Sequence, residues 1–213
     1  IFSELNSFLE TLGKITMNGV ATAKFIIKGD FNFNEISEQC YRFGITSLPI
    51  TLSIVGMTSI IVASQVALEM VKQGGSNFVG LLMTMLIVRE VGVIMSGFAI
   101  ISMIGSSLAS ELATMRVTEQ IDAIEVLKVS PIKYLFVPRV IAGLVMMPPV
   151  VVIASVVGVI AGAVTAHLTS GLGYRAFFDS AWLGIYMKDL GVCLLKALFF
   201  GGTISLISCS CGY

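Results

Sequence analysis

The chain has 213 residues, of which 56% are hydrophobic and 12% are charged, and its mean hydropathy is +0.95. A soluble globular domain carries about 25% charged residues, so this composition excludes one and favours a polytopic membrane protein. The 13 basic residues balance the 13 acidic residues, and nothing in the charge indicates a nucleic-acid partner. Four cysteines and one histidine offer few ligands, so we expect no metal site.

The first 42 residues precede the first long apolar window. Apolar side chains recur at helical spacing from Leu5 to Ile15, with charged residues between them. We predict that residues 1–28 form an amphipathic helix in the membrane surface, and that a short helix near residues 35–42 leads into the first span. A soluble cap packed on another subunit is the alternative.

Four windows are apolar and long enough to cross a bilayer, which takes about 20 residues. Eight Lys and Arg residues lie before the first window or between the second and third, and three lie on the opposite side. Because basic residues favour the cytoplasmic side, we expect the N-terminus and the 109–138 loop there. The fold expected is all-α and polytopic, with spans over residues 43–70, 78–108, 137–166 and 190–210.

A polar segment separates the second and third windows. Residues 110–131 have the period of one amphipathic helix, which Pro131 would end. One face is apolar, and the opposite face is acidic with Met115 set among the acids. Such a face suits a basic cleft on a partner protein, although a solvated face between two spans explains it equally well. The residues of the acidic face are Glu111, Thr118, Glu119, Asp122 and Glu125.

Two adjacent charges, Arg89 and Glu90, fall near the middle of the second window. A charge at mid-membrane costs about 2.5–3.5 kcal/mol, so this pair should face the bundle interior or a polar cavity. One interpretation is a headgroup site in which Arg89 donates to a phosphate. The other is a structural ion pair that ties two helices together. Gln65, in the first window, is expected to hydrogen-bond across helices.

The third and fourth windows carry further signals. Pro148 and Pro149 remove backbone donors, which predicts a kinked or broken helix. Small residues recur every four positions from Ala154 to Ala166, which allows close packing within the subunit or across a dimer. Lys196, early in the fourth window, is expected to reach the outer interface.

Motifs of common enzymes are absent from the sequence. It contains no GxxxxGKS or GxxxxGKT loop, so the chain is not expected to hydrolyse ATP itself. Neither HExxH nor GxSxG occurs, so the usual parts of a membrane hydrolase are missing. We therefore predict a membrane subunit without catalytic residues.

A close resemblance to a known family is carried by the run ELATMRVTEQIDAIEVLKVSPIKYLFVPRVIAG, residues 111–143. This run resembles the permeases of Mla-type lipid ABC transporters, which are the MlaE and YrbE proteins and the chloroplast trigalactosyldiacylglycerol import permease. Further matches follow in the same order along the chain. They are Gln65, Arg89-Glu90 with Gly92, and Gly212-Tyr213.

Two departures from the family accompany the resemblance. Ser102-Met103 stands where the family usually has Gly-Arg, so any role of that arginine is missing or moved here. The family continues past Gly-Tyr into a fifth spanning helix, whereas this sequence ends at Tyr213. The chain is therefore expected to be a single permease domain, residues 1–213, truncated before that helix.

The resemblance implies a homodimer of permease subunits that moves phospholipid or a related lipid between membranes. Each subunit would bind a cytoplasmic ATPase, which holds ATP and Mg, so this chain needs no cofactor of its own. A ring of MCE-domain proteins would sit on the far side of a bacterial inner membrane or, alternatively, of a plastid inner envelope. Residues 110–131 would be the coupling helix.

The resemblance also assigns residues to two sites. The ATPase-coupling residues would be Glu111, Met115, Arg116, Glu119, Gln120 and Asp122, and the lipid-binding residues would be Arg89, Glu90 and Gln65.

Two other classes of function stay open at this point. An ATPase-independent scaffold or passive lipid channel does not require an acidic docking helix, although nothing in the loop forbids one. A secondary transporter would have inverted repeats and coupling-ion carboxylates within its spans. Glu90 is the only acid deep in a predicted span, so this class ranks third.

Overall fold

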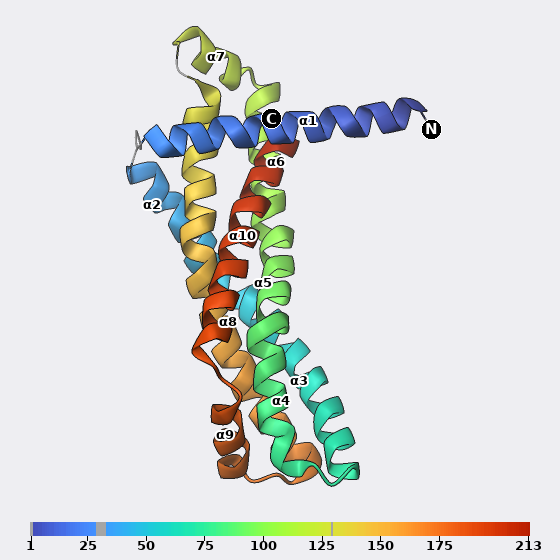
Figure 1. Ribbon diagram of the computed structural model, residues 1–213. Helices are drawn as coiled ribbons and strands as arrows, with labels where there is room; N and C mark the ends of the chain where they lie inside the picture. The colour runs from blue at the N-terminus through green and yellow to red at the C-terminus, as the bar shows by residue number, and fades with distance from the viewer. Residues whose placement is uncertain (1, 29–32, 129) are drawn as a thin grey trace.

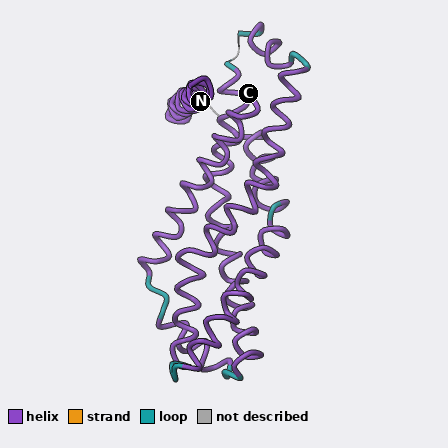
Figure 2. Tube along the Cα trace, turned by 90° about the vertical axis from the view of Figure 1, so that its right-hand side faces the viewer, coloured by secondary structure: helices purple, strands orange, loops and turns teal. Residues whose placement is uncertain are grey.

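The computed structural model describes residues 2–28, 33–128 and 130–213, and this part of the chain is helical without a β-strand. Within it, four helices are long and apolar enough to cross a membrane. They lie side by side in one elongated bundle (Figures 1 and 2). The prediction of an all-α polytopic membrane protein is therefore confirmed. The four candidate spans are Phe33–Lys72, Ser76–Val117, Ile132–Ser170 and Met187–Gly212.

Most spans combine α-helical pieces with short π-helical or 3-10 segments, labelled η. In chain order the elements are α1 (Phe2–Lys28), α2 (Phe33–Tyr41), η1 (Arg42–Thr46), α3 (Leu48–Lys72), η2 (Ser76–Phe78), α4 (Val79–Leu86), η3 (Ile87–Val91), α5 (Gly92–Ile100), η4 (Ile101–Gly105), α6 (Ser106–Val117), α7 (Gln120–Val126), η5 (Ile132–Phe136), α8 (Val137–Ser170), α9 (Tyr174–Leu183) and α10 (Met187–Gly212).

Helix α1 lies across one end of the bundle, and Figure 2 views it end-on. It packs on α10 and η5, while apolar side chains such as Met17, Val20 and Ile27 stay exposed. Exposed apolar side chains on a helix at the end of a bundle suit a position in the membrane surface. That α1 lies in the membrane surface remains a prediction. Residue 1 and the side chain of Leu5 lie outside what the structure describes. The short helix predicted near residues 35–42 is confirmed as α2, which forms the beginning of the first candidate span.

The predicted single helix over residues 110–131 is wrong. Helix α6 continues the second span to Val117 and ends there, because Glu119 adopts a left-handed conformation with φ of 57°. A β-branched pair, Val117-Thr118, precedes this turn, and such residues favour a helix weakly. Helix α7 follows the turn, and Pro131 begins the next span instead of ending this segment, as proline prefers at a helix start. Residue 129 lies outside the described part.

Of the two alternatives predicted at Pro148-Pro149, a kinked or a broken helix, the broken helix is wrong, because α8 runs through both prolines. The two prolines remove only the bonds that their own amides would have donated inside this helix, and packing on α3 and α10 supports the rest. The predicted small-residue stripe from Ala154 to Ala166 is buried, and Gly158 lies against Val55 and Ser59 of α3. The stripe therefore packs within the subunit.

Helices α8 and α10 cross closely where two glycines meet. A Cβ atom at Gly201 would press on the carbonyl of Gly143 and lie 2.8 Å from the Cβ of Met147. Small residues allow such contact between backbones in membrane helices. Short helix α9 was not predicted, and it packs on α4 through Gly80, beside Phe177.

We expect Gly201→Ile to destabilise the bundle, because the new side chain meets backbone that cannot move aside. Overpacking of this kind costs about 1–3 kcal/mol. The measurement is the thermal unfolding midpoint of the purified protein in detergent. Gly191→Ile is the matched control, since Gly191 lies on the same helix with no heavy atom near its Cβ position. Equal midpoints for the two variants would contradict the close crossing.

Candidate functional site

The end of the bundle that carries α1 also carries α6, α7 and the last turn of α10 (Figure 1). Glu119, Gln120 and Asp122 are exposed there, as docking residues would be. Arg116 is also exposed, and its guanidinium carbon lies 5.7 Å from the ring centre of Tyr213. We call residues 116–126 the α7 tip.

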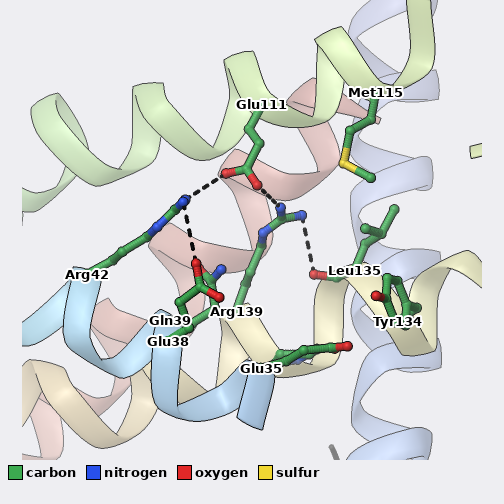
Figure 3. A pocket seen from close by; sticks show the side chains of 10 residues that line it. Glu35, Glu38, Gln39, Arg42, Glu111, Met115, Tyr134, Leu135 and Arg139 are labelled. Atoms are coloured by element: carbon green, nitrogen blue, oxygen red, sulfur yellow. Dashed lines mark hydrogen bonds and ion pairs between the residues drawn. The ribbon is translucent and has the colours of Figure 1, made fainter. Parts of the chain in front are cut away.

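Two of the predicted docking residues face the bundle instead. Met115 packs against the hydrophobic core, and the Glu111 side chain is only 36% exposed. Both line a pocket of about 230 Å³ that Figure 3 shows from close by. The pocket lies between α2, α6, η5 and the start of α8. Its lining residues are Glu35, Glu38, Gln39, Arg42, Glu111, Met115, Tyr134, Leu135, Pro138 and Arg139.

Glu111 accepts hydrogen bonds from two arginines across this pocket (Figure 3). Its Oε2 lies 3.0 Å from Nη1 of Arg42, and its Oε1 lies 2.9 Å from Nη2 of Arg139. Arg139 is 5% exposed and also donates to the carbonyl of Leu135 at 3.4 Å. A guanidinium buried this deeply requires a carboxylate to offset its lost hydration. We call Arg42, Glu111 and Arg139 the Glu111 triad.

Tyr213 ties the end of α10 to this region. Its ring meets Phe136 edge-on at 5.6 Å between centroids. Burial raises the pKa of the Tyr213 phenol above its ordinary value, the Glu125 carboxylate raises this pKa further, and the Arg116 guanidinium opposes both. The phenol therefore stays neutral at physiological pH.

Farther along the bundle, the charges of the second span pair with α10. Arg89 Nε lies 3.0 Å from Oδ1 of Asp189, and Glu90 Oε1 lies 2.8 Å from Nζ of Lys196. Lys196 also donates to the backbone carbonyl of Arg89 at 3.1 Å. Glu90 and this carbonyl therefore hold the ammonium group of Lys196, and its place at the outer interface stays a prediction. We call these four residues the charged cluster.

The charged cluster borders a pocket of about 400 Å³ with apolar walls. Arg89 keeps 49% of its side chain exposed, so part of the guanidinium remains accessible from this pocket. Gln65 is exposed on α3 and is not part of the lining, so the structure does not bring it together with Arg89 and Glu90. The lining residues are Leu82, Met85, Leu86, Arg89, Glu90, Asp189, Val192 and Lys196.

Comparison with known proteins decides the family. Residues 36–213 match the family described as Permease MlaE. The chain belongs to the MlaE permease family. A probable ABC transporter permease of Rickettsia typhi is 32% identical over 206 residues, which cover 97% of this chain and 80% of that protein.

Two further relatives carry the same description. A probable ABC transporter permease of Synechocystis sp. is 34% identical over 187 residues, which cover 88% of this chain and 71% of the relative. The probable ABC transporter permease ycf63 of Porphyra purpurea is 31% identical over 209 residues, which cover 98% and 80% respectively. The chain is therefore an ABC transporter permease and a multi-pass membrane protein.

The sequence analysis did not predict the pairing of four charged residues in the Glu111 triad and the charged cluster. Arg42 and Arg139 served only to orient the spans. Asp189 fell just outside the predicted fourth span, and Lys196 was expected at the outer interface. An unpaired charge within the membrane is costly, so the sequence indicated that Arg89 and Glu90 have partners. It did not indicate which residues these partners are. Among the described residues, no group of three His, Cys, Asp or Glu side chains is placed to hold a metal ion.

We expect the Glu90 and Lys196 side chains to stabilise the bundle as a pair. Lys196→Met and Glu90→Gln should each lower the unfolding midpoint, while the double variant loses less than their sum. Polar pairs between membrane helices couple by about 1 kcal/mol, which the double-mutant cycle measures. The control is the exposed pair Glu69 and Lys72, 4.0 Å apart within one helix, for which the coupling is near zero. Additive effects at Glu90 and Lys196 would contradict the pairing.

Proposed function

We propose that this chain is the membrane permease subunit of an ATP-driven transporter that moves phospholipid, or a related lipid, between membranes. The proposal rests on one observation, namely that the accessible charged cluster lies beside a pocket with apolar walls. A lipid needs both, because its headgroup requires charged partners and its acyl chains require apolar surface. Family membership supports the transporter class.

Within the charged cluster, we assign the headgroup to Arg89. Its Nε pairs with Asp189, so the two terminal nitrogens of the guanidinium can donate hydrogen bonds to phosphate oxygens. Glu90 is occupied by Lys196, so it is assigned the role of holding the second span against α10. Leu82, Met85 and Leu86 line the apolar wall beside Arg89 and would contact acyl chains.

ATP hydrolysis is assigned to a separate cytoplasmic ATPase, which would hold the ATP and Mg. The α7 tip supports this assignment, because it presents Glu119 and Asp122 to solvent at one end of the bundle, where basic residues of a partner could bind them. By resemblance to its family, we assign a homodimer of permeases and a ring of MCE-domain proteins on the opposite side. The location assigned is a bacterial inner membrane, with a plastid inner envelope as the alternative.

We expect Arg89→Ala to lower lipid transport about tenfold, the size of one lost charge-assisted hydrogen bond. The measurement is ATP-dependent lipid transfer by the complex in proteoliposomes, with ATPase assembly followed by copurification. Assembly should be unchanged. Wild-type transfer by this variant would contradict the headgroup role.

A matched variant separates headgroup binding from helix pairing. Asp189→Asn breaks the same ion pair but keeps the guanidinium, so it should transport far better than Arg89→Ala. Equal loss in both variants would mean that Arg89 only ties two helices together. Arg175→Ala, which removes an exposed arginine from α9, should change nothing.

Reversal of the α7 tip should weaken the ATPase contact. In Glu119→Lys with Asp122→Lys, two acids become bases, and like charges then face the basic partner, so we expect binding about tenfold weaker. Copurification and lipid-stimulated ATP turnover are the measurements. Glu69→Lys is the control, because this exposed acid lies at the opposite end of the bundle.

Unchanged assembly and turnover in the reversed variant would overturn the docking assignment. A wild-type chain that forms a stable complex without any ATPase, in several mild detergents, would instead indicate a scaffold or passive lipid channel.

A further inference from the structure

We propose that Glu111 is a positioning residue that transmits movement of the α7 tip to α2 and α8. The inference rests on the proposed function, in which a partner that hydrolyses ATP binds the α7 tip. It concerns the Glu111 triad, whose two ion pairs link α6 to the end of α2 and to the start of α8.

One carboxylate joins three separate parts of the chain. Glu111 lies on α6, which leads directly into the α7 tip. Its two oxygens contact different elements, since Oε2 meets Arg42 at the junction of α2 with the first span, and Oε1 meets Arg139 near the start of α8. Movement of α6 therefore reaches the first and third spans through one side chain.

The space around this carboxylate makes the polar contacts important. The pocket of about 230 Å³ separates parts of α2 and α6, so these helices do not pack tightly there (Figure 3). Leu108 and Leu112 connect α6 to the core, but apolar contacts are non-directional and let helices slide. Charge-assisted hydrogen bonds are directional and keep their two ends in register.

The burial of Arg139 makes its ion pair with Glu111 costly to break. With 5% of Arg139 exposed, separating it from Glu111 would leave a poorly hydrated guanidinium without its carboxylate, which is costly. Movement of α6 should therefore draw α8 along instead of opening the ion pair. Arg42 is more exposed and shares its guanidinium with Glu38 at 3.8 Å, so the connection to α2 is the weaker of the two.

The test is Glu111→Gln in the full permease, assembled with its ATPase in proteoliposomes. Glutamine has the same shape but lacks the charge. We expect ATP hydrolysis to stay within about twofold of wild type, while lipid transferred per ATP hydrolysed falls about tenfold. Wild-type transfer per ATP would overturn the proposal.

Two variants of the same cluster provide controls. Glu38→Gln removes a carboxylate that also pairs with Arg42 but lies on α2 itself, so transfer per ATP should not change. Arg42→Gln removes only the connection to α2 and leaves Arg139 paired, so an intermediate loss is expected. If Glu111→Gln does not fold, Arg42→Gln decides the question, and wild-type transfer per ATP by that variant rejects the proposal.

Hydrogen exchange provides a readout that loss of stability alone would not produce. Nucleotide trapping of the wild-type complex should change exchange in both the α7 tip and α2. In Glu111→Gln the change at the tip should persist and the change at α2 should disappear. A persistent change at α2 would overturn the proposal.

The two proposals fail separately. A wild-type complex that shows nucleotide-dependent exchange at α2 but transfers no lipid would reject lipid transport, and loss of this exchange in Glu111→Gln would still support the triad.

Discussion

The cost of an unpaired charge among apolar helices governs this structure. Lipid-facing helices gain little by packing apolar surfaces together, because the surrounding acyl chains are equally apolar. Charged pairs have no such alternative partner, so each one fixes which helices meet and at what height. Arg89 with Asp189 and Glu90 with Lys196 hold the second span against α10. The Glu111 triad does the same for α6, α8 and the start of the first span.

Small residues complement these pairs by letting the backbones approach. Helix α8 has close neighbours on two sides, with Gly158 against α3 and Gly143 against Gly201 of α10. Such crossings set distance but not register, because glycines offer no directional bond. The charged pairs supply the register. Together they explain how a bundle with so few polar residues adopts one arrangement.

The spans were predictable from sequence because length and apolarity are local properties, and the four predicted windows lie within the four observed helices. The exposed acids of the α7 tip followed from periodicity in the same way. The interruption of the helix at Glu119 depends on a left-handed backbone conformation, which the periodicity of side chains does not reveal. Lys196 is 106 residues from Glu90 along the chain, and Arg42 is 69 residues from Glu111, so only the folded arrangement identifies these partners.

The second span is longer than a bilayer requires. Its 42 residues correspond to a rod of about 63 Å at 1.5 Å per residue, whereas a bilayer with its headgroups is about 40–45 Å thick. A straight helix of this length perpendicular to the bilayer would extend roughly 20 Å beyond the headgroups. A tilt of about 10° around the middle of the rod would swing either end sideways by about 5 Å. The span is thus long enough for a small tilt within the bilayer to be converted into a displacement of several ångströms at its ends.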